Sequence, residues 1–191
     1  TPEGLIDKML TAANVTHQDK VFDLGAGDGI IAITAARKYN AQSVGIEFNP
    51  DMAQFARRKV AEAGLNDKVR IITGDIFQED FSSATVVTLY LMPHLNMKLR
   101  PTLLKMKPGT RIVSHAFTMG DWEPDETMSY RHSVGYFWVV PAQVEGAWVM
   151  NGMDGGPIRL NMSQSFQNIG GTLTRGGQTF AMLGARLRGD E

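Results

Sequence analysis

The sequence contains no cysteine among its 191 residues. Without cysteine, a disulfide scaffold, a thiolate metal site and a cysteine nucleophile are all excluded, while the compartment stays open. The sequence also has no apolar run of about 18 residues, so no segment is expected to span a membrane. Neither sign of charge is in excess, because the sequence has 19 Lys and Arg residues and 20 Asp and Glu residues. This balance disfavours a nucleic-acid partner, which would need a basic surface.

The remaining composition is that of an ordinary globular protein. Apolar residues make up 43% and charged residues 20%, so extensive disorder is not expected. We expect a cytoplasmic location; because the chain starts at Thr1 rather than Met, a removed N-terminal targeting segment stays open. No metal site is predicted, because the four histidines lack the spacing of metal ligands. They are His17, His94, His115 and His132.

The chain divides into two parts with different patterns. Up to about residue 115, short β-branched runs alternate with helical periods, which is typical of βα units and a parallel sheet. Beyond about residue 133, Gly and aromatic residues separate short alternating runs that predict antiparallel strands. We therefore predict an α/β fold with a doubly wound, mostly parallel sheet over residues 1–132. An antiparallel β-rich C-terminal extension over residues 133–191 would complete the sheet or form a small subdomain.

The pattern also predicts individual elements. Helices are expected at residues 1–13, 30–39, 49–63 and 96–106, and strands of the first part at 21–24, 43–48, 69–73, 85–91 and 111–115. In the extension, strands 135–140 and 144–150 are expected to pair with each other around Pro141-Ala142, and further strands at 158–166, 171–174 and 178–183. Pairs of glycines predict turns at 155–156, 170–171 and 176–177.

A glycine-rich loop follows the first predicted strand. Gly25 and Gly27, with Ala26 between them, allow the backbone to pass close to a ligand, and Gly29 allows the next helix to pack tightly against the strand. A dinucleotide site of the form G-x-G-x-x-G would place its third glycine at position 30, which is Ile30. This spacing counts against an NAD-dependent oxidoreductase.

Acidic residues end three successive strands. Asp23 precedes the loop, where its carboxylate would repel a pyrophosphate but suit a positively charged ligand, such as a sulfonium with an α-amino group. Glu47 ends the second strand and is placed to accept hydrogen bonds from two ribose hydroxyls. Asp75 follows the third strand and is placed to accept the adenine amino group, with Phe48 and Ile76 flanking the ring.

This order of residues resembles the class I S-adenosylmethionine-dependent methyltransferases. The similarity spans roughly residues 1–115 and implies a Rossmann-like core over residues 1–132. It implies S-adenosyl-L-methionine as the cofactor and S-adenosyl-L-homocysteine as the product. The residues expected to bind the cofactor are Asp23, Gly25, Ala26, Gly27, Gly29, Glu47, Phe48, Asp75, Ile76 and Tyr90.

A narrower resemblance concerns the acceptor. Thr1-Pro2, the loop over residues 23–29 and Tyr90-Leu91-Met92-Pro93 resemble the small lysine N-methyltransferases. This group includes the mitochondrial enzymes that modify the adenine nucleotide translocase and the ATP synthase c-subunit, and their prokaryotic relatives. The resemblance implies N-methylation of a protein lysine. The sequence departs from the mitochondrial members by lacking a membrane segment and by carrying the β-rich extension.

Tyr90 and His94 are the candidate catalytic residues. They follow the strand beside the expected methyl donor, where they would orient an amine or pass on its proton. The alternative interpretation is a strand that ends at Pro93 and packs on the next helix. Direct in-line methyl transfer needs mainly positioning, so no dedicated general base is required. A small-molecule acceptor and a cofactor-binding module without turnover stay open, as do the number of methyl groups transferred and the oligomeric state.

Overall fold

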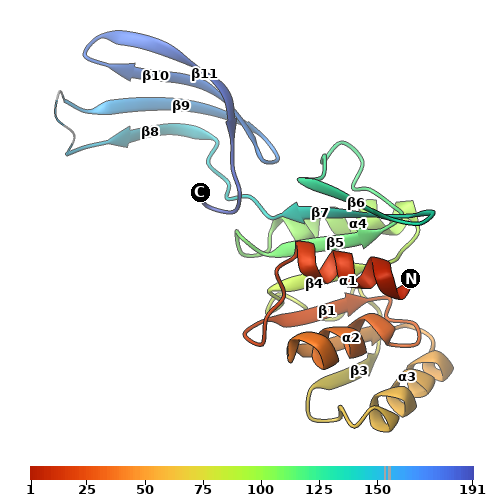
Figure 1. Cartoon of the computed structure of the whole chain (residues 1–191). Helices are drawn as coiled ribbons and strands as arrows, with labels where there is room; N and C mark the ends of the chain where they lie inside the picture. Colours follow the sequence, from red (N-terminus) through yellow and green to blue (C-terminus); the bar gives the residue numbers. More distant parts are fainter. Residues whose placement is uncertain (153, 155) are drawn as a thin grey trace.

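The computed structural model describes residues 1–152, 154 and 156–191. It contains two sheets (Figure 1). The large sheet consists of β1 (Lys20–Leu24), β2 (Gln42–Glu47), β3 (Val69–Thr73), β4 (Val86–Leu89), β5 (Arg111–His115), β6 (Glu126–Tyr130) and β7 (Ser133–Val139). The small sheet consists of β8 (Gly146–Met150), β9 (Ile158–Ser165), β10 (Asn168–Arg175) and β11 (Gln178–Arg186). The helices are α1 (Glu3–Ala12), α2 (Ile30–Tyr39), α3 (Pro50–Glu62) and α4 (Pro93–Leu104).

The large sheet has the order β3-β2-β1-β4-β5-β7-β6. The first five strands of this order run parallel, while β7 is antiparallel to both β5 and β6. The reversal of strand order beside β1 puts the ends of β1 and β4 at a topological switch point, where such sheets bind ligands. The predicted α/β, Rossmann-like, mostly parallel fold with an antiparallel C-terminal extension is confirmed.

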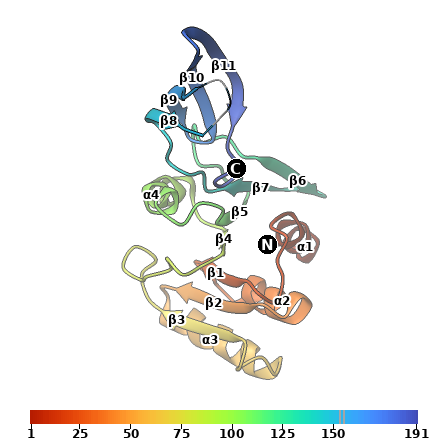
Figure 2. The ribbon, with the colours of Figure 1, turned by 90° about the vertical axis from the view of Figure 1, so that its left-hand side faces the viewer.

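Helices cover both faces of the large sheet (Figure 2). Helices α1 and α2 bury Leu5 and Ile31 against one face, to which Val21 of β1 points. Helix α4 buries Leu99 against the other face, to which Phe22 points. The alternation of Val21 and Phe22 is the period of two expected of a strand. Because both faces of β1 are covered, the strand and the loop that follows it have a fixed position.

The helix starts show local determinants. Asn49 caps α3, because its Oδ1 accepts hydrogen bonds from the amides of Asp51 and Met52 at 2.9 and 3.1 Å. Helix α4 begins at Pro93, three residues before the predicted start at Asn96. Proline suits the first helical turn because its backbone angle is already helical and no amide hydrogen is needed there. No described helix is both long and apolar enough to cross a bilayer.

Two predictions about the extension were wrong. Residues 135–140 were expected to pair with 144–150, but Phe137 of β7 faces Val113 of β5, and Trp148 of β8 faces Leu160 of β9. Strand β7 joins the large sheet because its buried aromatic side chains complete the main core. Strand β6 was not predicted, since its residues are mostly exposed and its apolar alternation is limited to Met128 and Tyr130. The small sheet thus begins only at β8.

The second wrong prediction is the turn at Gly170-Gly171, which lies inside β10. A Cβ atom on Gly171 would come within 2.0 Å of the Asn161 carbonyl oxygen on β9. The glycine therefore permits a close approach between strands rather than a chain reversal. The predicted turn at Gly176-Gly177 is confirmed between β10 and β11. The predicted turn at 155–156 includes residue 155, which lies outside the described residues.

The turn between β9 and β10 attaches the small sheet to the core. The Phe166 ring stacks on the Trp122 ring with centroids 5.9 Å apart, and Gln167 Nε2 donates to the Glu123 carbonyl at 2.8 Å. The chain enters the small sheet from the end of β7, where Val139 pairs with Arg111 at the start of β5. The extension therefore leaves the core beside the amino ends of the parallel strands (Figure 1).

Candidate methyl-donor site

The loop between β1 and α2 is held against β2. The amides of Gly25 and Ala26 both donate to the Ile46 carbonyl at 2.9 Å. Gly25, Gly27 and Gly29 have φ angles of 79°, 55° and 79°, a region that side chains disfavour. The sequence therefore forms a tight bend in which backbone amides, rather than side chains, face the end of the sheet. This is the geometry that the glycine spacing predicted.

Asp23 lies directly beneath this bend. Its side chain is almost fully buried, at 2% exposure, and its Oδ1 accepts a 2.7 Å hydrogen bond from Thr88 Oγ1 on β4. Burial raises the pKa of the Asp23 carboxyl to about 7, and the negative charges of Asp28 and Glu47 act in the same direction. A cation at this position would offset that penalty, because an opposite charge favours the ionised carboxylate.

Glu47 bridges the loop and the end of β2. Its Oε2 accepts from the Gly27 amide at 2.7 Å, and its Oε1 accepts from the Asn49 amide at 2.9 Å. The Glu47 carbonyl accepts from Gly74 at 3.0 Å, which brings the end of β3 alongside. Each carboxylate oxygen has capacity for a further hydrogen bond. The carboxylate is thus fixed in place and still able to accept hydroxyl donors.

Asp75 and Ile76 follow β3 at the same edge of the sheet. Asp75 Oδ1 accepts from the Phe77 amide at 2.9 Å, and Ile76 is buried. Phe48, after β2, exposes 75% of its surface, which leaves its ring available to a ligand. The structure therefore places all three predicted acids at the carboxyl ends of β1, β2 and β3, with one buried and one exposed apolar side chain beside them.

A contact that the sequence did not predict anchors the loop on its outer side. Lys59 Nζ on α3 lies 2.5 Å from Asp28 Oδ2, and Asp28 Oδ1 accepts from the Ile30 amide at 3.2 Å. Lys59 was not singled out because the residues around it form a basic run typical of a solvated helix face. The ion pair ties the bend to α3 and neutralises one of the acids around Asp23.

Tyr90 lies at the end of β4 with half of its surface exposed. Its ring packs on the ring of His115, at the end of β5, with a centroid separation of 4.1 Å. His115 is buried, its Nδ1 lies 3.0 Å from Thr1 Oγ1, and burial lowers its pKa. His94 is exposed on the first turn of α4. The aromatic neighbour of Tyr90 is thus His115, a contact between strands that sequence spacing does not reveal.

Asn96 on α4 contacts the end of β5 and the loop that follows it. It is fully buried, and its Nδ2 lies 3.3 Å from Ser114 Oγ and from the carbonyls of Phe117 and Thr118. The loop after β5 is therefore fastened to α4, beside the strand end that carries Tyr90. An asparagine within a predicted helix gave no signal of this role.

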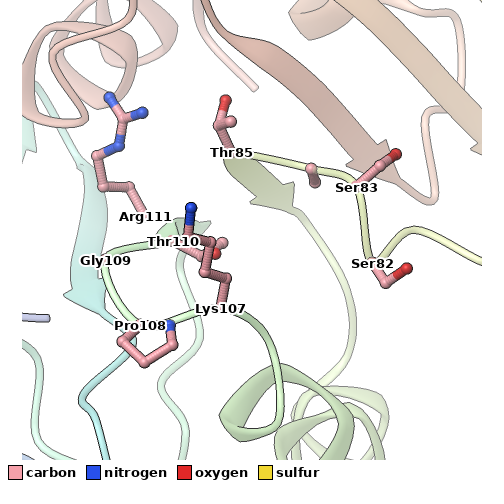
Figure 3. Close-up of a pocket in the computed structure, with 9 residues that line it drawn as sticks. Ser82, Ser83, Thr85, Lys107, Pro108, Gly109, Thr110 and Arg111 are labelled. Carbon is pink, nitrogen blue, oxygen red and sulfur yellow. The ribbon is translucent and has the colours of Figure 1, made fainter. Parts of the chain in front are cut away.

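A pocket of about 410 Å³ lies at the other end of the large sheet, where β4 and β5 begin. Figure 3 shows its wall, which includes Thr85 before β4 and the segment 107–111 leading into β5. Arg111 there is paired with Asp19. Because these residues precede β4 and β5, the pocket lies at the amino ends of the strands, away from the loop and the three acids. No cluster of metal-binding side chains was found among the residues that the structure describes.

Comparison with known proteins agrees with this geometry. The family model described as ANTKMT methyltransferase domain matches residues 23–126, and the chain belongs to this family. A protein-lysine N-methyltransferase of Saccharolobus islandicus is 42% identical over 130 residues, covering 67% of this chain and 81% of the relative. The mouse adenine nucleotide translocase lysine N-methyltransferase is 30% identical over 106 residues, 55% of this chain and 46% of that protein. The matched region thus spans less than half of the mouse relative.

A solved structure extends the comparison to the cofactor. The RNA methyltransferase from Salinibacter ruber, crystallised with S-adenosyl-L-homocysteine, is 48% identical with a TM-score of 0.74, covering 75% of this chain and 95% of that chain. The chain is therefore an S-adenosyl-L-methionine-dependent methyltransferase, as the sequence predicted. The residues described above fit such a donor, because they combine backbone amides, a buried acid and a fixed carboxylate at one edge.

Proposed function

We propose that this chain transfers a methyl group to the ε-amine of a protein lysine, with the donor lying across the carboxyl ends of β1, β2 and β3. The observation that carries the donor position is Glu47, whose carboxylate is oriented by both the loop and the start of α3. The acceptor is proposed from the lysine-methyltransferase relative that is 42% identical over 130 residues. The uncharged lip formed by Tyr90 and His115 suits an amine that must lose its charge.

Each site residue has a proposed role. Asp23 balances the positive charge of the donor, and the backbone of Gly25, Ala26, Gly27 and Gly29 lies along its amino-acid portion. Glu47 accepts hydrogen bonds from the two ribose hydroxyls. Asp75 accepts one from the adenine amino group, while Phe48 and Ile76 lie on either side of the base. Tyr90 lines the path to the methyl group.

The chemistry needs little beyond positioning. S-adenosyl-L-methionine supplies an electrophilic methyl group on a positively charged sulfur. The lysine nitrogen forms the new N–C bond as the C–S bond breaks, and the amine proton leaves to water. Partial burial beside Tyr90 and His115 would lower the pKa of an entering amine, because burial disfavours its charged form. Tyr90, braced by His115, orients the lone pair, and alignment of this kind is worth effective molarities of about 10⁵ M or more.

An RNA acceptor is the second candidate, because the Salinibacter ruber relative, named an RNA methyltransferase, is 48% identical. The balance of 19 basic and 20 acidic residues argues against it, since RNA binding relies on a basic surface.

Radiolabelled methyl donor, incubated with the enzyme and a cell lysate, distinguishes the acceptors. Lysine methylation predicts label that is removed by protease, survives ribonuclease and is recovered as methyl-lysine after hydrolysis. Label that ribonuclease removes would replace the lysine proposal with the RNA one, and label confined to low-mass material would indicate a small-molecule acceptor. The cytoplasmic location expected from the sequence stays a prediction, which cell fractionation tests.

A further inference from the structure

The small sheet has one apolar face. Trp148 on β8 pairs with Leu160 on β9, Leu160 pairs with Leu173 on β10, and Leu173 pairs with Phe180 on β11. Directly paired residues point to the same side of a sheet. Four large apolar side chains therefore form a continuous row across all four strands.

The neighbouring rows extend this face. On one side of the central row, Met150 of β8 pairs with Ile158 of β9. On the other side, Met162 of β9 and Met182 of β11 both pair with Gly171 of β10, which lies between them. Residues two apart on a strand share a face. The opposite face is mostly polar and exposed, with Arg159, Asn161, Ser163, Thr172, Thr174 and Thr179.

No described helix covers the apolar face. Helices α1 to α4 pack on the large sheet, and the small sheet extends away from them as a single layer (Figures 1 and 2). Trp148 is 48% exposed and Phe180 54% exposed. Since a sheet with one apolar face is stable in water when a second layer buries that face, the chain presents half of a β-sandwich.

We propose that a second copy of this chain supplies the missing layer. In the dimer, the two apolar faces, defined by the Trp148–Leu160–Leu173–Phe180 row and its neighbours, pack against each other about a twofold axis. A face that carries large side chains in its central row, and methionines alternating with Gly146 and Gly171 in a neighbouring row, can interdigitate with its own copy, as the inner faces of sandwiches do at a distance of about 10 Å. An isologous contact of this kind closes at two subunits.

The size of the face is near the lower limit for a specific dimer. Four strands about 4.8 Å apart and about seven residues long, at about 3.3 Å per residue, span roughly 440 Å². Two such faces amount to a flat area of roughly 900 Å², below the minimum of about 1,000 Å² for a specific interface, so the relief of the side chains must supply the remainder. Its central row is aliphatic and aromatic, the composition typical of homodimer interfaces.

The position of the sheet favours an assembly role over acceptor docking. The sheet joins the core at the amino end of β5, through the Val139–Arg111 pair, whereas Tyr90 and His115 lie at the opposite, carboxyl ends of β4 and β5. Dimerisation through the small sheets therefore leaves both donor sites open to acceptors.

Light scattering coupled to size-exclusion chromatography tests the proposal on the whole chain. Wild type is expected at twice the 21.0 kDa chain mass. Phe180→Glu places a charge in the apolar face and is expected to raise the dimer dissociation constant at least about tenfold, since an unpaired charge is costly to bury. Ala181→Glu on the same strand is the matched control, because Ala181 is exposed and pairs with Thr172, so it lies on the polar face.

The outcomes separate clearly. A monomeric wild type at micromolar concentration, with or without capture of an unrelated protein, overturns the proposal. So does loss of the dimer in Ala181→Glu, or its persistence in a Phe180→Glu variant that binds the methyl donor normally. A second measurement leaves the apolar face intact: the chain lacks cysteine, so Ala181→Cys, on the polar face, carries a single spin label. An intermolecular distance that disappears on dilution with unlabelled chain supports the dimer, and its absence contradicts it.

Discussion

The Tyr90 ring rests on the His115 ring at a centroid distance of 4.1 Å, with the two planes tilted by 30°. The two residues come from adjacent parallel strands, β4 and β5, and both lie just at or beyond the carboxyl ends. Tyr90 is half exposed while His115 is buried, so the histidine supports the tyrosine beside the proposed donor site.

His115→Ala is expected to raise the KM for the acceptor and lower kcat/KM about fivefold, because Tyr90 loses its support; a stacked aromatic pair contributes about 1 kcal/mol. His115→Phe, which keeps a ring, should recover most of this loss. Steady-state kinetics with varied acceptor measures the effect, and the Kd of the methyl donor should be unchanged in both. An equal loss in the matched control His17→Ala, at an exposed histidine before β1, would contradict this assignment.

Glu47→Ala is expected to weaken donor binding by about 10- to 100-fold. Hydrogen bonds to a charged group contribute about 1.5–3 kcal/mol, and this carboxylate is proposed to accept two from the ribose while it holds the Gly27 amide. Isothermal titration calorimetry measures the change. Glu62→Ala, at the exposed end of α3, is the control and should bind the donor normally. Unchanged affinity in Glu47→Ala would remove Glu47 from the site.

Asp23 makes the ligand-free protein less stable as pH rises from about 4 to 7. Its pKa is raised from 3.8 to about 7 in the folded chain, so within this window the folded state binds more protons than the unfolded state, and stability falls with pH. Asp23→Asn should flatten this slope in thermal melts compared with wild type. If both proteins show the same slope, the buried carboxyl does not titrate as described.

Donor binding should show the opposite trend. Because the ionised carboxylate of Asp23 balances a positive charge, affinity for the donor is expected to increase as pH rises through about 7. Asp23→Asn should bind more weakly and lose this pH dependence. Calorimetry between pH 6 and 8, in buffers of differing ionisation enthalpy, measures both the affinity and the proton released on binding. Release of no proton near pH 6 would contradict the prediction.

Phe166→Ala is expected to lower the free energy of unfolding by about 2 kcal/mol, since a half-buried aromatic ring is removed. The ring stacks on Trp122 and Arg100 lies over it at 5.3 Å, so the change should also loosen the small sheet and expose residues 142–145 to protease. Denaturant unfolding and limited proteolysis measure the two effects. Phe55→Ala, at an exposed ring on α3, should have little effect on either.

The sequence predicted the arrangement of the candidate donor site because its determinants are local. Asp23, the glycine bend and Glu47 each follow a strand directly, and parallel strands bring their carboxyl ends together. The positions of α2 and β3 were also predictable, since each has a continuous apolar pattern with clear boundaries.

Contacts between distant segments were not predictable in the same way. The support of Tyr90 by His115 and the pairing of β7 with β5 depend on strand order, which a single sequence does not contain. Pairing of residues 135–140 with 144–150 was the local choice, and burial of Phe137 and Trp138 in the main core outweighed it. Gly171 looked like a turn residue because its neighbour is also glycine, while its actual requirement comes from Asn161 on the next strand.

The reversed direction of β7 has a wider consequence. Because β7 runs antiparallel to β5, the chain returns to the amino ends of the parallel strands before the small sheet starts. The small sheet is therefore separated from the proposed donor site at their carboxyl ends. An exchanged appendage would therefore leave the carboxyl ends of the parallel strands in place, provided that it replaces the contact of Phe166 with Trp122.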